Sequence, residues 1–185
     1  MDRCPAQLCG SGDFLMKPKA LILGGIALAL LVAWGWPLRI LVLRDVRDGC
    51  RVFAHVVSPG DTFSLRYTHS VKQKPVWDFY RIDAHYRIMQ TQTIFPDSDF
   101  GLPSLAVGTE IYTLLPDGNG CISGMRRLIP SLQLRVERAY NNILTFGEAT
   151  SVNLSQKCGD SILEMRIQNM NLIQYAFRAM KFYGE

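Results

Sequence analysis

The densest group of polar side chains lies between Tyr67 and Asp78, in the stretch Tyr-Thr-His-Ser-Val-Lys-Gln-Lys-Pro-Val-Trp-Asp. His69 can change its charge near neutral pH, and Asp78 supplies a negative partner. Ser70 beside His69 suggests a serine hydrolase, but adjacent residues of a strand point to opposite faces, so this pair needs a bend between them. The alternatives are a turn in which His69 or Ser70 bonds loop backbone, and a polar binding cleft.

A metal site is the second kind of chemistry that these residue types allow. It would draw on three imidazoles and a carboxylate, namely His55, His69 and His85 with Asp78 or Asp83. Nothing in the spacing of the histidines requires them to converge, and the sequence has no glycine-rich phosphate loop and no G-x-S-x-G nucleophile elbow. We therefore expect no metal and no cofactor, and we assign no catalytic residue.

Four residues form the predicted ligand-binding set: His69, Ser70, Asp78 and Gly101. Gly101 belongs to the next loop, where a glycine lets the backbone approach a ligand closely. His69 and Asp78 lie near one end of neighbouring predicted strands, and loops from different strands can meet there. If the protein has a functional site, we predict that these residues frame it.

The elements that must position this set are mostly strands, because apolar residues recur at every second position. One strand is predicted at 62–68 and a second at 76–90. We expect the two strands to pair antiparallel, with residues 70–74 at their connection. Pro75 belongs at the start of the second strand, since proline cannot donate a hydrogen bond inside a sheet.

Further short strands alternate with turns rich in Gly, Asp, Asn and Pro. They are predicted at 40–43, 51–57, 110–114, 132–138, 143–146, 150–154 and 162–167. Short strands at such regular spacing predict a mainly β fold, either a small antiparallel sandwich or a partly open barrel. The tail at 171–182 is either a short helix or a last strand.

Residues 20–38 form an uncharged run of nineteen residues before the predicted β domain. As a helix, this run would span roughly 28 Å at about 1.5 Å per residue, close to a hydrocarbon core of about 30 Å. It is either a transmembrane anchor, with Trp34 and Trp36 at the membrane interface, or a secretory signal cleaved after Ala33 and Gly35. The predicted segments are a cytoplasmic tail or n-region at 1–19, the anchor or signal segment at 20–38 and an extracytoplasmic β domain at 39–185.

The composition excludes several other classes of protein. A chain of 185 residues that is 48% hydrophobic can build one sizeable core, which excludes long disorder. The net charge is only +4 and there is no run of Lys and Arg, so nucleic acid is not an expected partner. Export would place Cys50, Cys121 and Cys158 in an oxidising compartment, where at most one intrachain disulfide forms and Cys121 with Cys158 is one candidate pairing.

The motif at 67–71, followed by 75–78 and the Gly-Leu-Pro loop at 101–103, resembles the bacterial domain of unknown function numbered eighteen-fifty. The resemblance covers residues 41–167. It departs from the family pattern at Lys72, where the family usually has an acid. The resemblance implies an envelope protein, often encoded beside TRAP-type transporters whose solute receptors belong to the TAXI class. The partners it implies are the TRAP transporter membrane subunits or a TAXI-type solute receptor.

We accordingly expect a single-pass inner-membrane protein whose C-terminal domain is extracytoplasmic, or a periplasmic protein after signal cleavage. The expected partners are the membrane itself and the transporter components that the resemblance implies. The function expected from the resemblance is that of an accessory or binding component of a TRAP-type solute uptake system. The alternatives are an envelope hydrolase or metal-dependent enzyme that uses His69, and a purely structural envelope module.

Overall fold

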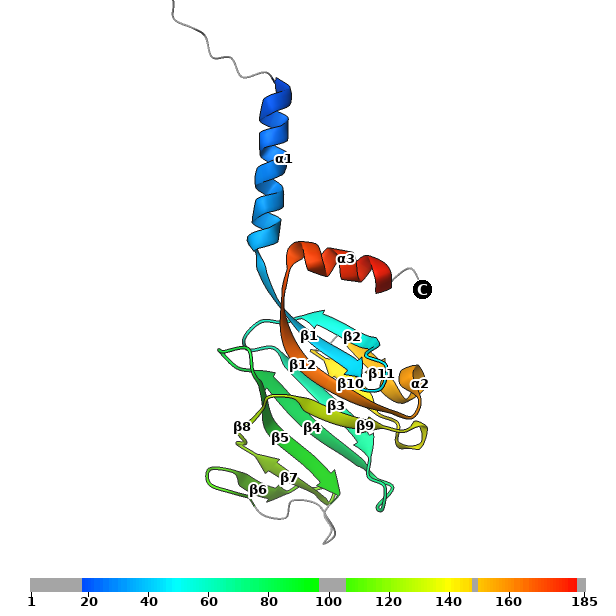
Figure 1. The fold of residues 1–185 in the computed structure, drawn as a ribbon. Helices are drawn as coiled ribbons and strands as arrows, with labels where there is room; N and C mark the ends of the chain where they lie inside the picture. Colours follow the sequence, from blue (N-terminus) through cyan, green and yellow to red (C-terminus); the bar gives the residue numbers. More distant parts are fainter. Residues whose placement is uncertain (1–17, 97–105, 148–149, 183–185) are drawn as a thin grey trace, which may run out of the picture. The chain divides into compact units, whose positions relative to one another are not determined.

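The computed structural model describes residues 18–96, 106–147 and 150–182, which divide into two compact units (Figure 1). One unit contains the helices near the two ends of the chain. The other unit runs from Pro37 to Met170 and contains the strands that the sequence predicts. The predicted ligand-binding residue Gly101 and the predicted tail up to residue 17 lie outside the described residues.

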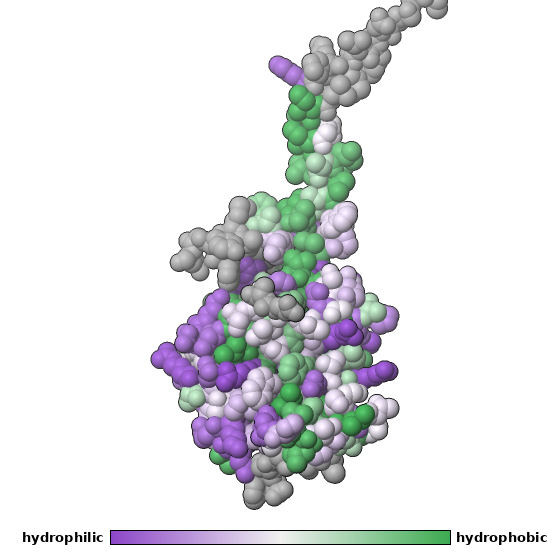
Figure 2. Space-filling model, turned by 180° about the vertical axis from the view of Figure 1, so that it is seen from behind, coloured by the Kyte–Doolittle hydropathy of each residue, from purple (hydrophilic) through white to green (hydrophobic). Residues whose placement is uncertain are grey.

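Helix α1, Pro18–Gly35, is apolar along its length, with no charged residue after Lys19. Its side chains are exposed in every direction: Ile22, Leu23 and Leu31 are 63%, 66% and 69% exposed. Figure 2 shows the helix as a predominantly hydrophobic surface. Among the described residues, no helix has both the length and the hydrophobicity that a membrane crossing requires.

Helix α3, Leu172–Phe182, occupies the tail for which the sequence allowed either a helix or a strand. The start of α3 is fixed by a reciprocal cap between Asn171 and Gln174. The Asn171 side chain accepts a hydrogen bond from the backbone N–H of Gln174 at 2.7 Å, and the Gln174 side chain accepts one from the backbone N–H of Asn171 at 3.2 Å. This cap satisfies two backbone donors at the helix start and so favours the helix over a continued strand.

The unit from Pro37 to Met170 contains two antiparallel β sheets (Figure 1). The smaller sheet has the strand order β2-β1-β12-β9, formed by Arg51–Val56, Pro37–Asp45, Ser161–Asn171 and Leu132–Val136. The larger sheet has the order β11-β10-β3-β4-β5-β7-β6, formed by Thr150–Asn153, Ile143–Phe146, Thr62–Thr68, Pro75–Ile82, Ile88–Pro96, Asn119–Ser123 and Ile111–Leu114. Strand β8, Arg127–Ile129, pairs with β5 outside this path.

The main hydrophobic core takes side chains from both sheets, which therefore pack face to face. Leu43 of β1, Leu163 of β12 and Leu144 of β10 are completely buried in it. Truncating one such leucine to alanine typically costs about 2–5 kcal/mol of stability. The predicted mainly β, antiparallel, sandwich-like fold is confirmed, and the described strands do not close into a barrel.

The single strand predicted at 76–90 is wrong, because β4 ends at Ile82 and β5 begins at Ile88. The Asp83 side chain makes the turn between them: Oδ1 accepts hydrogen bonds from the backbone N–H groups of His85 and Arg87, each at 2.8 Å. Tyr86 takes the left-handed conformation with φ at 58°. The apolar alternation continues through this turn, so periodicity alone does not reveal it.

The sequence also missed four short elements: strand β7, strand β8, the 3-10 helix η1 at Arg138–Tyr140 and helix α2 at Leu154–Cys158. The candidate disulfide between Cys121 and Cys158 is not formed, since both thiols are free. Cys121 lies on β7, where its sulfur accepts a hydrogen bond from Gln92 Nε2 at 3.1 Å, whereas Cys158 ends α2. The two cysteines therefore belong to separate elements of the sandwich.

Candidate functional site

The connection between β3 and β4 is a tight turn closed by backbone hydrogen bonds. The His69 N–H donates to the Lys74 carbonyl at 2.8 Å, and the Gln73 N–H donates to the His69 carbonyl at 2.8 Å. Gln73 takes a left-handed conformation with φ at 53°, and its side chain donates to the Ser70 carbonyl at 2.6 Å. The predicted connection at 70–74 is therefore confirmed, with Pro75 as the first residue of β4.

The His69 imidazole holds this turn from inside. Its Nδ1 accepts hydrogen bonds from the backbone N–H groups of Val71 and Lys72, each at 3.3 Å. An accepting Nδ1 carries no proton, so the neutral ring has its proton on Nε2. Among the described residues Nε2 has no hydrogen-bond partner, and His69 is half-buried. His69 thus fixes the turn with one nitrogen and keeps one donor available.

Asp78 lies on β4, opposite Leu65 of β3 and Thr93 of β5. Its side chain shares the inner face of the sheet with Val76 and Tyr80, which belong to two different apolar clusters. Asp78 therefore places a carboxylate between two hydrophobic surfaces, where an ionised group needs hydrogen bonds.

Three donors supply those hydrogen bonds. Gln90 Nε2 donates to Asp78 Oδ1 at 3.2 Å, and the hydroxyls of Tyr67 and Thr93 also bond the carboxylate. We call Asp78, Tyr67, Gln90 and Thr93 the Asp78 network. Burial raises the pKa of Asp78, and the hydrogen bonds from Thr93, Tyr67 and Gln90 oppose this increase. Burial, together with the Asp78 charge, likewise raises the pKa of Tyr67.

The Asp78 network is a nearly complete set of hydrogen bonds that ties β3, β4 and β5 together. A carboxyl group whose pKa is raised is common at functional sites, and structural networks share this property. The geometry thus supports a structural role directly. A role in binding stays a prediction.

The structure brings only part of the predicted ligand-binding set together. His69 and Ser70 share the β3–β4 turn, whereas Asp78 points into the Asp78 network. No hydrogen bond or ion pair joins His69 to Asp78 within the described part of the chain. Whether these residues bind a ligand together with Gly101 stays a prediction, because Gly101 is not among the described residues.

Sequence reasoning missed Gln90 and Thr93 as partners of Asp78. The predicted strand ended at Gln90, so the pairing of β5 with β4 was not visible. The run Gln90–Thr93 is polar within an otherwise apolar strand, and this is the signal that could have indicated a buried polar partner. Thr93 lies directly opposite Asp78, and a register shift between Phe79 and Tyr80 places Gln90 opposite Tyr80, two residues from Asp78 along β4.

The histidines occupy three separate places in the sandwich. His55 of β2 packs against the ring of Phe146, with ring centroids 4.2 Å apart, and His85 is exposed in the β4–β5 turn. His69 lies at the opposite end of β4 from His85. Among the described residues, no group of three or more His, Cys, Asp or Glu side chains could hold a metal ion.

The hydrolase hypothesis has no additional geometric support. Within the described residues, no hydroxyl or thiol is hydrogen-bonded to the His69 imidazole. Ser70 is exposed and follows His69 directly in the turn. An enzymatic role of His69 stays a prediction that needs an activity measurement.

Comparison with known proteins identifies the segment that carries these features. A family model described as Domain of unknown function (DUF1850) matches residues 63–152, which include the β3–β4 turn and the whole Asp78 network. No curated protein and no solved structure matches the chain significantly. Residues 63–152 of this chain thus match the model of the DUF1850 family, the family that its sequence resembles.

Proposed function

We propose that this protein is a single-pass, inner-membrane envelope protein whose extracytoplasmic β sandwich binds a component of a TRAP-type solute uptake system. The observation that carries the proposal is the exposure of apolar side chains in every direction around α1. An isolated helix without a polar face is stable in lipid but not in water. The proposed orientation places the larger domain outside the cytoplasm, following a short N-terminal segment with basic residues.

The β3–β4 turn is the surface that we propose for partner binding. Val71 at its tip is 73% exposed, and Ser70 beside it is exposed as well. The His69 imidazole holds the turn in one conformation, so little conformational entropy is lost when a partner binds. The class of partner, a TRAP membrane subunit or a TAXI-type receptor, comes from the family resemblance.

Membrane insertion is tested by a charge in the middle of α1. Leu28→Arg is expected to cost about 2.5–3.5 kcal/mol of insertion free energy, whereas the control Leu28→Phe retains an apolar side chain. Wild type and the Phe variant should resist carbonate extraction, and an alkaline phosphatase fused to the C-terminus should be active. Wild-type protein released at full length by carbonate, or an inactive fusion, contradicts the anchor or its orientation.

Partner binding is tested by a charge at the tip of the turn. Val71→Asp should abolish co-purification with TRAP subunits or the TAXI receptor expressed in the same cells. Val107→Asp is the matched control, because Val107 is a 68% exposed valine away from the turn. If both variants keep the complex, or if wild type forms none, the proposed partner is wrong.

A purely structural envelope module is the second candidate function. The observation that favours it is the use of His69 Nδ1 by the backbone of its own turn. In this case Val71→Asp leaves all phenotypes unchanged, while substitutions of His69 lower only the melting temperature. Uptake that fails at unchanged melting temperature excludes this candidate.

A further inference from the structure

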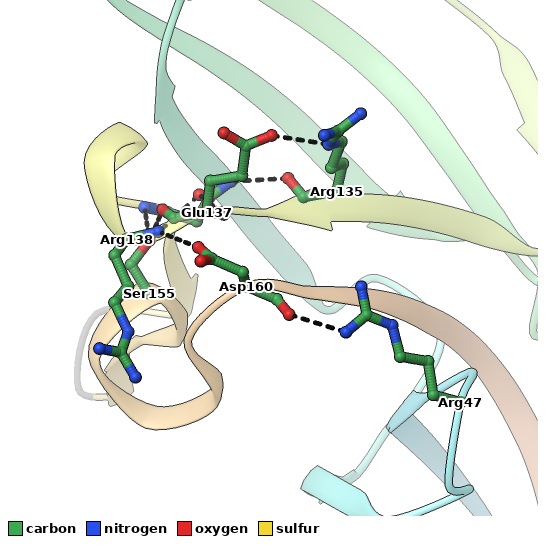
Figure 3. A network of polar contacts seen from close by, with 7 residues as sticks. Arg47, Arg135, Glu137, Arg138, Ser155 and Asp160 are labelled. Carbon is green, nitrogen blue, oxygen red and sulfur yellow. Dashed lines mark hydrogen bonds and ion pairs between the residues drawn. The ribbon is translucent and has the colours of Figure 1, made fainter.

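A cleft of about 560 Å³ lies at one end of the smaller sheet, next to η1. Three arginines line it: Arg47 from the turn after β1, Arg135 from β9 and Arg138 from η1 (Figure 3). Asp160, from the turn between α2 and β12, lies between Arg138 and Arg47. The lining residues come from three separate parts of the chain, so the cleft exists only in the folded sandwich.

Asp160 fixes two of the arginines at the cleft. Its carboxylate Oδ1 accepts a hydrogen bond from the backbone N–H of Arg138 at 3.0 Å, and its carbonyl accepts one from Arg47 Nη1 at 3.2 Å. The turn that carries Arg47 is held in addition by Asp45, whose Oδ1 accepts from the Arg47 backbone N–H at 2.8 Å. The backbone of the site is therefore preorganised, which reduces the entropy cost of binding.

The balance of charge in the cleft favours an anion. Three arginines and two carboxylates, those of Glu137 and Asp160, line the cleft, which leaves one net positive charge. Glu137 is paired with Arg135 at 2.6 Å from Oε1 to Nε, and the Asp160 carboxylate receives a backbone donor. Among the described residues, the Arg138 guanidinium has no hydrogen-bond partner. Guanidinium donors in this position recognise carboxylate and phosphate oxygens.

We propose that this cleft binds a small organic anion that carries a carboxylate or phosphate group. The volume suits a small molecule, since ligand pockets typically measure roughly 300–1,000 Å³. The exposed side chains of Ala139 and Ile162 give the cleft an apolar part that can cover a short carbon chain. The cleft belongs to the sandwich itself, so this binding is independent of the proposed anchor and of the proposed transporter partner.

Calorimetric titration of the full-length chain in neutral detergent tests the proposal. The probes are succinate and inorganic phosphate, with the neutral diol 1,4-butanediol as the matched compound. At least one anion should bind, its affinity should fall as salt is added, and the diol should not bind. If neither anion binds, or if the diol binds as well as succinate, the proposal is wrong.

Two opposite substitutions locate the binding. The double variant Arg47→Gln, Arg138→Gln should bind the anion about tenfold or more weakly, because two charged donors are lost. Glu137→Gln should increase the affinity for the anion several-fold, since Arg135 is released from the Glu137 carboxylate. The exposed Arg126 provides the control variant Arg126→Gln, which should change nothing.

The gain expected for Glu137→Gln cannot result from unfolding, so it distinguishes binding from a loss of structure. Melting temperatures of all variants are measured alongside. Unchanged affinity in the double arginine variant places the anion elsewhere and overturns the proposal. The proposal is also overturned if both small anions fail to bind and an acidic peptide binds the cleft, because this result identifies a protein partner instead.

Discussion

The Asp78 network and the arginine cleft are both built from charged and polar side chains, but their hydrogen bonding is opposite. In the Asp78 network three donors converge on one carboxylate between apolar clusters. In the cleft the guanidinium groups outnumber the carboxylates, and Arg138 keeps its donors available among the described residues. The comparison suggests that saturated polar groups hold a fold together, whereas polar groups with spare donors in an open cleft are available for a ligand.

Removing one donor from the Asp78 network should have the largest effect on stability. Thr93 is 5% exposed, and Thr93→Val keeps its shape but deletes a hydrogen bond to a charged group. We expect a loss of about 1.5–3 kcal/mol of unfolding free energy at neutral pH. Urea denaturation of the folded chain measures it. A loss below about 0.5 kcal/mol would show that the network is not a stabilising element.

The pH dependence of stability should reveal the buried Asp78 carboxyl. Burial raises its pKa in the folded chain above the ordinary 3.8, so the folded state binds this proton more tightly than the unfolded state. Protonation therefore adds stability that is fully present below pH 3.8 and is lost as the pH rises through the raised folded pKa. The variant Asp78→Asn has no carboxyl group to protonate at this position, so it lacks this pH-dependent contribution to stability.

The measurement is the difference in unfolding free energy between wild type and Asp78→Asn across that pH range. As the pH falls, the unfolding free energy of wild type should rise relative to that of the variant. The rise should be about 1.4 kcal/mol for each unit by which the pKa of Asp78 differs between the folded and unfolded states. A difference that is constant with pH, or that moves in the opposite direction, contradicts the burial of an ionisable group at this position.

The His69 turn should show a smaller effect. His69→Leu removes the acceptor for two backbone N–H groups and should cost about 1 kcal/mol. His69→Asn offers a short side-chain acceptor that commonly bonds its own turn, so it should recover part of this loss. Thermal unfolding of both variants tests the difference, and equal destabilisation would show that the imidazole acts through packing rather than through Nδ1.

The arginine cleft should give the smallest effect on stability. Arg47→Gln and Arg138→Gln are exposed changes that leave no buried group unpaired, and each should alter the unfolding free energy by less than about 0.5 kcal/mol. Urea denaturation under the conditions used for Thr93→Val checks this. Losses as large as that of Thr93→Val would erase the distinction between the two regions.

The sequence predicted the mainly β fold and most strands because half-buried antiparallel strands alternate visibly. The strand at 62–68 is found with its predicted bounds, and Pro75 begins β4 as expected. The β4–β5 turn was missed because Asp83 organises it through side-chain hydrogen bonds while the apolar alternation continues across it. Helix α2 and η1 were missed because each has five residues or fewer, which is too short for helical periodicity.

The sites were less predictable than the fold, because they depend on contacts between distant segments. His69 and Asp78 were identified from residue type, but the Thr93 and Gln90 partners depend on the pairing of β5 with β4. The arginine cleft joins Arg47 to Asp160, which is 113 residues later in the chain. No local pattern marks such a pair, so only the folded sandwich reveals it.

The central claim is that the cleft binds a small anion while the β3–β4 turn does not. Amide chemical shifts of the isotope-labelled full-length chain in neutral detergent test this directly during a titration with succinate or inorganic phosphate. We predict that the amides of Arg138, Asp160 and Ser161 shift in a saturable manner, while those of Val71 and Lys72 stay in place. Saturable shifts at Val71 and Lys72 with none at Arg138, Asp160 and Ser161 would contradict the account.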